Sequence, residues 1–247
     1  MRDNHFKIII PSFNNEKWIK ACINSVKSQD YDNYQCIIVD DLSTDDSINR
    51  IVPLLNEKVL LVENKVKKLA LRNICEAIEI SKPAPEDVIV TLDGDDFLAN
   101  KSVLSTLNRT YLDKECWMTY GSYMEYPSMR RGKFSKEIAD SVIKYNAFRE
   151  IEWSSSHLRT FKFKLWREID KKDLLMDNGK HCDGAWDMAF MFPMLEMAGE
   201  RSSYIRKILH IYNRANVLNE DKVRHHALLD SERRIRNMKR YKRIDTL

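Results

Sequence analysis

Short apolar runs alternate with helical periodicity along the first hundred residues of the chain. The runs are rich in Ile, Val and Leu, which is typical of strands buried in a sheet, and the apolar residues between them recur every three or four positions. This alternation predicts βαβ units and an α/β fold built on a mainly parallel sheet flanked by helices. The predicted strands are 6–10, 34–39, 59–62 and 88–92, and helices are expected to include Trp18, Ile48 and Leu71 near their starts.

The pattern becomes mixed beyond residue 115. A strand is expected at 117–126, a loop at 130–136 and a helix at 183–198 that Pro193 interrupts. Upstream, Ser43-Thr44-Asp45-Asp46 resembles a capping box in which the first hydroxyl and the last carboxylate satisfy free backbone N–H groups. A chain of 247 residues builds one substantial core, so residues 1–247 are expected to form a single domain.

Composition excludes several classes of protein. The longest apolar stretch, 189–195, is far shorter than a membrane span, and 6–10 is too short for the core of a signal peptide. Five cysteines form no C-x-x-C pair, and those at 22, 36 and 75 lie in apolar periodic segments, which favours a reducing compartment. We therefore expect a soluble, cytoplasmic protein.

Positive charge is concentrated at the C-terminal end. The net charge is only +4, yet residues 222–243 hold nine Lys and Arg against two acidic residues. Leu228, Ile235 and Met238 fall at loosely helical spacing among these cations. Such a basic helix, over 221–247, could lie on an anionic membrane, or it could pack its narrow apolar side on the domain. Nucleic acid is disfavoured because the cations of 222–243 lack interleaved aromatic residues other than Tyr241.

The clearest chemical signal is Asp93-Gly94-Asp95-Asp96, directly after the fourth predicted strand. Ligands of open α/β sheets bind outside the carboxyl ends of the strands, so this cluster is expected to meet residues 12–16 and Asp40-Asp41 in one crevice. Two carboxylates separated by a glycine can turn toward one hard cation, and Mg²⁺ or Mn²⁺ could then clamp a diphosphate.

Three alternatives compete for this cluster. It could be a plain acidic turn, because Asp and Gly are common turn residues. A calcium EF-hand loop is disfavoured, since its sixth and twelfth positions would be Leu98 and Leu104. An aspartate-dependent phosphatase could use Asp93 as nucleophile, although its first aspartate is expected on the first strand.

Four stretches in order resemble glycosyltransferase family 2. They are Ile8-Ile9-Ile10-Pro11-Ser12-Phe13-Asn14-Asn15-Glu16, Ile37-Ile38-Val39-Asp40-Asp41-Leu42-Ser43-Thr44-Asp45, Leu71-Arg72-Asn73 and Thr91-Leu92-Asp93-Gly94-Asp95-Asp96. The resemblance covers about the first 40% of the chain. It implies a GT-A type, Rossmann-like fold with a nucleotide-sugar-binding half at 1–100, an acceptor and catalytic-base half at 101–220, and the basic C-terminal helix.

The resemblance also implies roles for individual residues. Pro11, Ser12, Phe13 and Glu16 would line the nucleoside pocket, and Asp41 would accept a hydrogen bond from a uracil-like base. Asp93 and Asp95 would hold the metal and, with Gly94, the sugar diphosphate. Arg72 and Asn73 match a position near the donor, and Arg159, with His157, could contact diphosphate or acceptor. Each also has a structural alternative, such as ending a strand, packing or capping a turn.

Asp187 matches the catalytic base of the family. Such a carboxylate takes the proton from an acceptor hydroxyl as the oxygen attacks the anomeric carbon. Trp186 stands where a Glu is common, and Asp183 is a nearby rival. Two further departures are Lys65-Val66, in place of a glycine after Asn64, and the lack of a clear late histidine ligand. His210, His225 and His226 are candidates by order alone.

The expected function is inverting transfer of a sugar from a nucleotide-sugar, with UDP favoured, to a hydroxyl of a glycan, a lipid-linked or a protein-linked acceptor, with Mn²⁺ or Mg²⁺ as cofactor. A non-catalytic nucleotide-sugar-binding module and the phosphatase are the alternatives. Peripheral membrane contact would run through the basic C-terminal helix.

Overall fold

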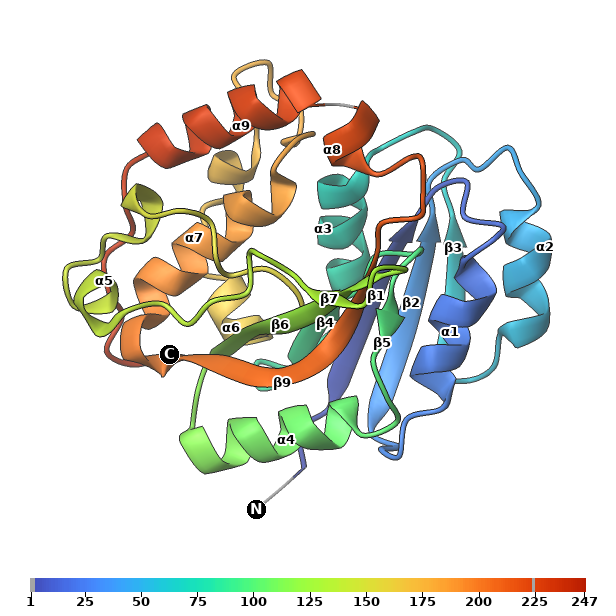
Figure 1. Ribbon diagram of the computed structural model, residues 1–247, viewed down its shortest axis with the longest axis horizontal. Coiled ribbons are helices and arrows are strands. Elements are labelled where there is room, and N and C mark those ends of the chain that lie inside the picture. The colour runs from blue at the N-terminus through green and yellow to red at the C-terminus, as the bar shows by residue number, and fades with distance from the viewer. Residues whose placement is uncertain (1–2, 224) are drawn as a thin grey trace.

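One mixed sheet organises the molecule (Figure 1). The computed structural model describes residues 3–223 and 225–247, and within them nine strands form a sheet of order β3-β2-β1-β4-β8-β6-β9-β5, with β7 paired to β6. The strands are β1 (Phe6–Ser12), β2 (Tyr34–Asp40), β3 (Val59–Glu63), β4 (Val88–Thr91), β5 (Phe97–Leu98), β6 (Met118–Tyr126), β7 (Arg130–Arg131), β8 (Arg159–Lys162) and β9 (Ser202–Asn213).

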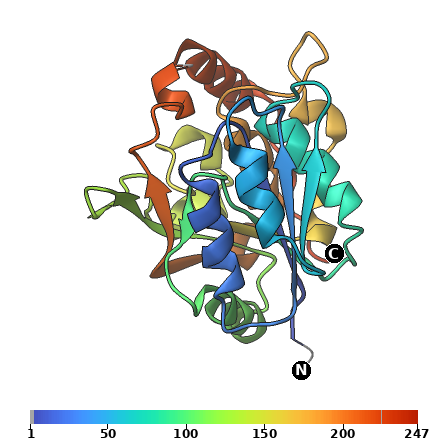
Figure 2. The ribbon, with the colours of Figure 1, turned by 90° about the vertical axis from the view of Figure 1, so that its right-hand side faces the viewer.

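Helices cover both faces of this sheet (Figures 1 and 2). The α-helices are α1 (Ile19–Lys27), α2 (Ser47–Ile51), α3 (Ala70–Ile80), α4 (Val103–Lys114), α5 (Asp140–Lys144), α6 (Phe163–Trp166), α7 (Trp186–Ala198), α8 (Glu220–Val223) and α9 (His225–Asn237). Short 3₁₀ turns lie at Val52–Leu54, Phe148–Glu150, Lys171–Leu174 and Gly199–Arg201.

The first four strands confirm the predicted parallel sheet. β1 pairs in parallel with both β2 and β4, and β2 pairs in parallel with β3. Side chains along β1 alternate between two cores: Ile8 and Ile10 pack with α1 and α4 on one face, whereas Ile9 packs with α3 and α7 on the other. All four carboxyl ends therefore lie at one edge of the sheet.

The second half of the sheet has a different topology. β8 is antiparallel to both β4 and β6, β6 runs parallel to β9, and β5 returns antiparallel to β9. Because β5 follows the Asp93–Asp96 cluster directly, its pairing with β9 brings that cluster against the end of β9. The sheet thus joins residues about 115 positions apart in the sequence.

Three local predictions are wrong. No capping box forms: Ser43 Oγ accepts from Asn14 N–H, and Asp45 accepts from Ser47 N–H. Pro193 does not interrupt α7, because almost every residue of this helix is buried and packing outweighs one lost hydrogen bond. The expected loop at 130–136 begins as strand β7, which pairs with Met124 and Glu125 of β6.

The C-terminal helix packs its apolar side on the domain, which is the second of the two alternatives considered from the sequence. Ile235 of α9 is 1% exposed, and Leu228 and Met238 are partly buried against the same core. A buried ion pair fastens this region: Arg149 Nε and Nη2 contact the two carboxylate oxygens of Glu196 at 2.6 and 2.9 Å, and Arg149 Nη1 donates to the carbonyl of Ile235. The apolar side of α9 is therefore part of the fold.

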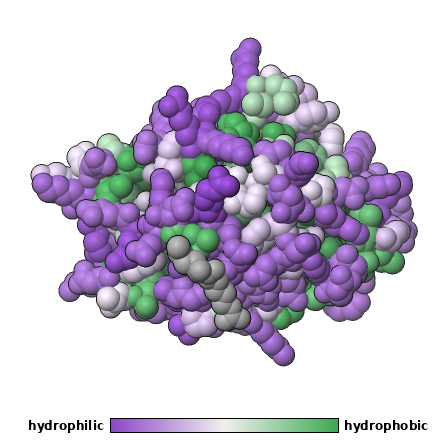
Figure 3. All heavy atoms as spheres, turned by 90° about the horizontal axis from the view of Figure 1, so that it is seen from below, coloured by the Kyte–Doolittle hydropathy of each residue, from purple (hydrophilic) through white to green (hydrophobic). Residues whose placement is uncertain are grey.

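The surface is mainly polar on the side away from the carboxyl edge of the sheet. Hydrophilic residues cover most of the face seen from below in Figure 3, and apolar residues there form scattered patches. No helix among the described residues is long and apolar enough to cross a membrane.

Candidate active site

A large cavity opens at the carboxyl edge of the parallel strands. Its volume is about 1090 Å³, which is ample for a nucleotide-sugar together with part of an acceptor. Its wall contains ten of the residues expected from the sequence: Pro11, Ser12, Phe13, Asp41, Asn73, Asp93, Gly94, Asp95, Arg159 and Asp187. The predicted convergence of separate motifs on one crevice is therefore present in the fold.

Gly94 lets the carboxylate cluster lie tightly against the loop after β1. A Cβ at this position would lie 2.8 Å from Ser12 Cβ and 2.9 Å from Asn15 Nδ2, closer than atoms pack. The Gly94 N–H also donates to the carbonyl of Pro11. The glycine is thus required by close approach between two binding loops.

The surroundings of Asp95 raise the pKa of its carboxyl group. Burial, together with the neighbouring charges of Asp96 and Asp93, raises the pKa of Asp95 to about 8, although Asn216 Nδ2 donates to its Oδ2 over 2.7 Å. Three carboxyl groups crowd into four residues at this point. A divalent cation bound by Asp93 and Asp95 would relieve their repulsion, and hard oxygen ligands suit Mg²⁺ or Mn²⁺. The donor set therefore fits such an ion.

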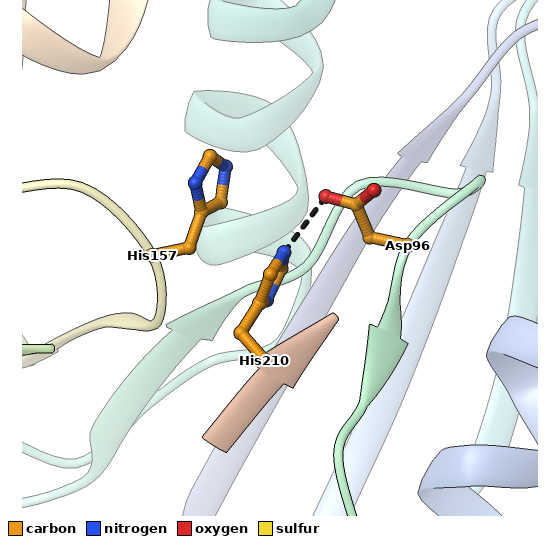
Figure 4. A group of neighbouring side chains, drawn as sticks. All are labelled: Asp96, His157 and His210. Carbon is orange, nitrogen blue, oxygen red and sulfur yellow. Dashed lines mark hydrogen bonds and ion pairs between the residues drawn. The ribbon is translucent and has the colours of Figure 1, made fainter. Parts of the chain in front are cut away.

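Asp96 is not part of the cavity wall, and its carboxylate turns toward His210 of β9 (Figure 4). Its Oδ2 lies 2.8 Å from His210 Nε2, and its Oδ1 accepts from Asn213 N–H. The His157 ring stacks on the His210 ring with 4.4 Å between centroids, and the ligand atoms of these three residues lie within 4.8 Å of one another. Burial, followed by the charge of Arg159, lowers the pKa of His210 to about 3, so that this imidazole is neutral.

Of the late histidines whose side chains the structure describes, His210 lies beside the carboxylate cluster. It does not line the cavity, and it holds Asp96 in place from behind. His226 is exposed on α9, and the side chain of His225 lies outside the described part of the chain. His157, in contrast, lines the cavity with its Nε2 atom 3.6 Å from Asp93 Oδ2.

Arg159 links the metal-binding cluster to the predicted base. Its Nη1 donates to Asp187 Oδ2 over 2.8 Å, and its Nη2 to Asp93 Oδ2 over 3.4 Å. The guanidinium is 1% exposed and lies over the Trp186 ring. Arg159 begins strand β8, which fixes the orientation of its side chain.

Asp187 lies in the first turn of α7, with Oδ1 accepting from the N–H of Met188. Burial raises the pKa of Asp187, the Arg159 charge opposes that rise, and the charge of Asp93 adds to it. A carboxylate with an elevated pKa beside a binding cavity is suited to accept a proton. Asp183 does not line the cavity, which favours Asp187 over its rival.

The nucleoside end of the cavity centres on Asp41. Its carboxylate accepts from the N–H groups of Lys68 and Leu69 at 2.8 and 2.9 Å and from Asn64 Nδ2 at 3.0 Å. Burial acts to raise the pKa of Asp41, but these hydrogen bonds outweigh it and hold the pKa below its ordinary value. Asp41 is therefore an ionised acceptor, and the Nδ2 of buried Asn73 has no hydrogen-bond partner within the described part of the protein.

Two residues expected in the donor pocket lie elsewhere. Glu16 does not line the cavity; its Oε2 accepts from Asp46 N–H and ties the loop after β1 to α2. Arg72 pairs with Glu76 one helical turn along α3 and is also outside the wall. Helical spacing from Asn73 accounts for this, because adjacent residues of a helix point in different directions.

Sequence reasoning missed much of the cavity wall beyond Asp187. Aromatic side chains from several separate segments line it, and α9 contributes a carboxylate and a guanidinium. No local motif marks these residues, since the β6–β9 pairing, the docking of α9 and the packing of both tryptophans in the core bring them together. They are Tyr123, Trp153, Trp186, Tyr212, Glu232 and Arg236.

A parallel sheet that presents Asp-Gly-Asp at its carboxyl edge, extended by the antiparallel strand β8 and completed by a buried carboxylate in the first turn of α7, is the arrangement of a GT-A glycosyltransferase fold. Residues 7–179 match the family model described as glycosyl transferase family 2, so the chain belongs to this family. The sequence-based recognition of the family and of the fold class is confirmed.

Three proteins illustrate the similarity. An uncharacterized glycosyltransferase of Haemophilus influenzae is 35% identical over 120 residues, which are 47% of this chain and 46% of the relative. The Escherichia coli UDP-Glc:alpha-D-GlcNAc-diphosphoundecaprenol beta-1,3-glucosyltransferase WfaP is 29% identical over 128 residues, 52% of this chain and 50% of that protein. The chain thus matches about half the length of these relatives.

The third is a solved structure, glucosyl-3-phosphoglycerate synthase from Mycobacterium tuberculosis in complex with Mn²⁺, UDP-glucose and phosphoglyceric acid, which superposes with a TM-score of 0.64. The match covers 96% of this chain and 81% of that one at 14% identity, a level that shows a shared fold.

Proposed function

We propose that this glycosyltransferase moves a sugar from a UDP-sugar to a hydroxyl acceptor with inversion at the anomeric carbon. The observation that carries the proposal is the Arg159 guanidinium, which holds a metal-binding aspartate and a separate base candidate, Asp93 and Asp187, on one cavity. Inversion follows the general behaviour of the family. The alternative phosphatase is disfavoured by family membership and by the place of Asp93 after the fourth strand.

Donor binding is assigned to the half of the cavity formed by residues 1–100. An ionised Asp41 accepts a hydrogen bond from a base N–H, and the unpartnered Nδ2 of Asn73 offers a donor to a base carbonyl. Uracil presents both groups on one edge. Phe13, whose ring has the Lys67 ammonium above it, gives the pocket an apolar wall. The UDP-sugars named for WfaP and for the mycobacterial structure support this choice.

Asp93 and Asp95 would hold the metal, for which we propose Mn²⁺ or Mg²⁺. When bound, the ion supplies positive charge that stabilises the departing diphosphate. Arg159 adds a fixed positive charge between the diphosphate site and the base, and its burial keeps water from screening that charge. The Mn²⁺ in the mycobacterial complex supports the proposed ion.

Asp187 acts as the general base. Its Oδ2 is held by Arg159 and its Oδ1 by the backbone at the start of α7, so the carboxylate has a fixed orientation toward the cavity. It removes the proton from the acceptor hydroxyl as that oxygen forms its bond to the anomeric carbon and the bond to the diphosphate oxygen breaks. General-base assistance of this kind contributes about 10²–10⁴ in rate.

The acceptor is assigned to the cavity beyond Asp187. Trp153 and Trp186 give this part of the cavity an aromatic wall, and Glu232 with Arg236 adds polar groups, a combination that suits a sugar ring bearing hydroxyls. We propose a glycan acceptor, lipid-linked as in the printed name of WfaP, and a cytoplasmic enzyme peripheral to the membrane that presents it. Protein-linked acceptors are the alternative.

Thermal shift with UDP, UDP-glucose, UDP-N-acetylglucosamine and GDP-mannose, each with and without Mn²⁺, tests donor and metal together. A Mn²⁺-dependent rise in Tm with one UDP-sugar is expected, and Asp95→Ala should abolish it. Full metal-dependent turnover in Asp95→Ala would remove the proposed role of the cluster.

A second pair of variants tests the base and separates an enzyme from a non-catalytic binding module. Asp187→Asn should keep the donor-induced shift and lose transfer by about 10²–10⁴, whereas Asp183→Asn should keep both. If Asp183→Asn loses transfer instead, the base is misplaced. If the wild type binds the donor yet transfers to no acceptor of a broad glycan panel, the binding module is favoured.

A further inference from the structure

Five exposed large apolar side chains lie on two segments that contribute to the wall of the active-site cavity. Val217, Leu218 and Val223 are 74, 41 and 55% exposed, and they lie on what we call the rim segment (217–223). Met129 and Tyr126, 56 and 39% exposed, lie on the hairpin tip (126–133) that joins β6 to β7 and extends to Lys133. Exposed apolar groups gathered at one place on a domain surface mark an interaction surface.

The rim segment and the hairpin tip diverge from a common point. Tyr126 at the end of β6 is paired with Asn213 at the end of β9, and Arg214 N–H donates to the Tyr126 carbonyl over 2.8 Å. The hairpin projects from the body of the molecule in Figure 2, and the rim segment ends with helix α8, near the top of Figure 1. Both contribute to the cavity wall, through Lys133 on one side and Leu218 and Val223 on the other.

The charged residues of the hairpin tip are all cationic. Residues 126–133 contain Arg130, Arg131 and Lys133 and no acidic residue. Arg131 is fastened by hydrogen bonds to Ser122 Oγ and to the carbonyl of Arg206, and Gly132 lies so close to the Tyr123 ring that no side chain fits there. The hairpin tip is therefore anchored at Arg131 and Gly132 and carries Met129 beside its cations, an arrangement that suits contact with an anionic surface.

The apolar side of the C-terminal helix is not available for such a contact. Ile235 is 1% exposed, and the carbonyl of the same residue accepts from buried Arg149. A membrane contact through that side of α9, as the sequence suggested, would require the helix to leave the domain. The exposed apolar groups at the cavity mouth need no such rearrangement.

We propose that the hairpin tip and the rim segment dock together on an anionic membrane surface, so that an acceptor held in the bilayer enters the cavity between them. This rests on the proposed lipid-linked acceptor. Apolar side chains reach the acyl boundary while neighbouring cations pair with anionic headgroups, as in other interfacial contacts. The bilayer would then also orient the cavity toward the headgroup layer, where the acceptor sugar lies.

Vesicle sedimentation of the full chain tests this directly, without donor or acceptor. Vesicles of phosphatidylcholine with about 30% phosphatidylglycerol, which gives the surface a negative potential, are compared with pure phosphatidylcholine. The wild type should sediment with the anionic vesicles and be released by salt. Met129→Ser/Val217→Ser should reduce binding by about fivefold or more, and Arg130→Gln by a smaller factor.

Val52→Ser/Ile80→Ser is the matched control, because these side chains are 52 and 48% exposed on other parts of the surface. It should bind vesicles as the wild type does, and all variants should keep the UDP-sugar thermal shift, since none of the changed residues lines the cavity. Absence of vesicle binding, or equal loss in the control, would overturn the proposal and point to a protein partner. Vesicle binding is measured without turnover. The membrane proposal can therefore fail while the proposed sugar transfer holds, and the proposed transfer can fail while vesicle binding holds.

Discussion

Arg159 donates to Asp187 across 2.8 Å while the same guanidinium contacts Asp93, so a single buried cation lies between the proposed base and the proposed metal site. The pair comes from the first residue of β8 and the first turn of α7. Neither residue is near Asp93 in sequence. The electrostatics of the base and of the diphosphate site are therefore coupled through one side chain, and this coupling can be measured.

Replacing Arg159 should move the pH dependence of transfer. The positive charge of Arg159 lowers the pKa of Asp187 against the effect of burial, so Arg159→Gln should raise that pKa. A base must be deprotonated, hence the acidic limb of kcat should move to higher pH. If the limb moves by one pH unit, the rate at a fixed pH on that limb falls about tenfold. The measurement is kcat against pH, with circular dichroism to confirm folding.

Lys162→Gln is the control for that experiment. Lys162 ends the same strand but pairs with Glu86, and it does not line the cavity. Its removal should leave the acidic limb where it is. An unchanged limb in Arg159→Gln, or a limb that moves to lower pH, would show that Asp187 is not the titrating base.

Asp95 should make the metal-free protein less stable as pH rises. Its pKa is about 8 in the folded chain, against an ordinary value of 3.8, because of burial and the nearby charges of Asp96 and Asp93. Between these values the folded state binds more protons than the unfolded state, so the free energy of unfolding falls as pH increases from about 4 to 8. Asp95→Asn should flatten this fall.

Denaturation midpoints at pH 5 and pH 8, with EDTA or with Mn²⁺, provide the measurement. Mn²⁺ should restore the stability of the wild type at pH 8 and have little effect on Asp95→Asn. The exposed Asp113→Asn on α4 serves as control and should follow the wild type. The assignment would be contradicted if the stability of the metal-free wild type changed between pH 5 and pH 8 in the same way as that of Asp95→Asn.

The parallel half of the fold could be predicted because its strands are buried on both faces. Ile8, Ile9 and Ile10 are all fully buried, which gives a continuous apolar run that no loop would carry. The motifs at the ends of these strands could be found for the same reason, since each follows such a run directly. Local information was sufficient there.

The other half depends on partners far along the chain. Arg159 is a buried cation at the start of a strand, stabilised by Asp187 and by Asp93, which precedes it by 66 residues, so its own segment has the pattern of a polar loop. β9 mixes Arg206, Lys207 and His210 with apolar residues, because some of its side chains face Asp96 and others face solvent. Helix α4 was not predicted, although the helical spacing of its buried apolar residues is a local signal.

Gly94→Ala should weaken donor binding with little effect on folding. The added methyl would lie 2.8 Å from Ser12 and 2.9 Å from Asn15, so the loop after β1 must move away from the Asp93–Asp95 turn. That movement separates the nucleoside wall from the metal site, and a displacement of about 1 Å is enough to cost roughly 10²-fold in kcat/KM. Steady-state kinetics over a range of donor concentrations measure the effect.

Gly179→Ala tests whether the effect at Gly94 comes from close approach. Gly179 has no atom within 4 Å of the position of an added Cβ, although its φ of 74° makes the substitution strained. It should lower Tm modestly and leave donor KM unchanged. Wild-type donor KM in Gly94→Ala would mean that the two loops do not need to touch during turnover.

Breaking the Arg149–Glu196 pair should release the C-terminal helix and reshape the acceptor side of the cavity. Both side chains are buried, 2 and 0% exposed, and Arg149 also binds the Ile235 carbonyl while Glu196 accepts from Tyr241 N–H. Arg149→Met leaves a buried carboxylate unpaired and should cost about 3–5 kcal/mol of unfolding free energy. Adding Glu196→Leu should recover part of that loss, because no unpaired charge then remains.

The exposed pair Lys136 and Glu152 is the control, and Lys136→Met should cost less than about 1 kcal/mol. Since Glu232 and Arg236 on α9 line the cavity, the Arg149 variant should also raise acceptor KM more than donor KM. Urea denaturation and two-substrate kinetics on the same samples measure both effects, and a variant that loses stability with both KM values unchanged would show that α9 plays no part in binding the acceptor.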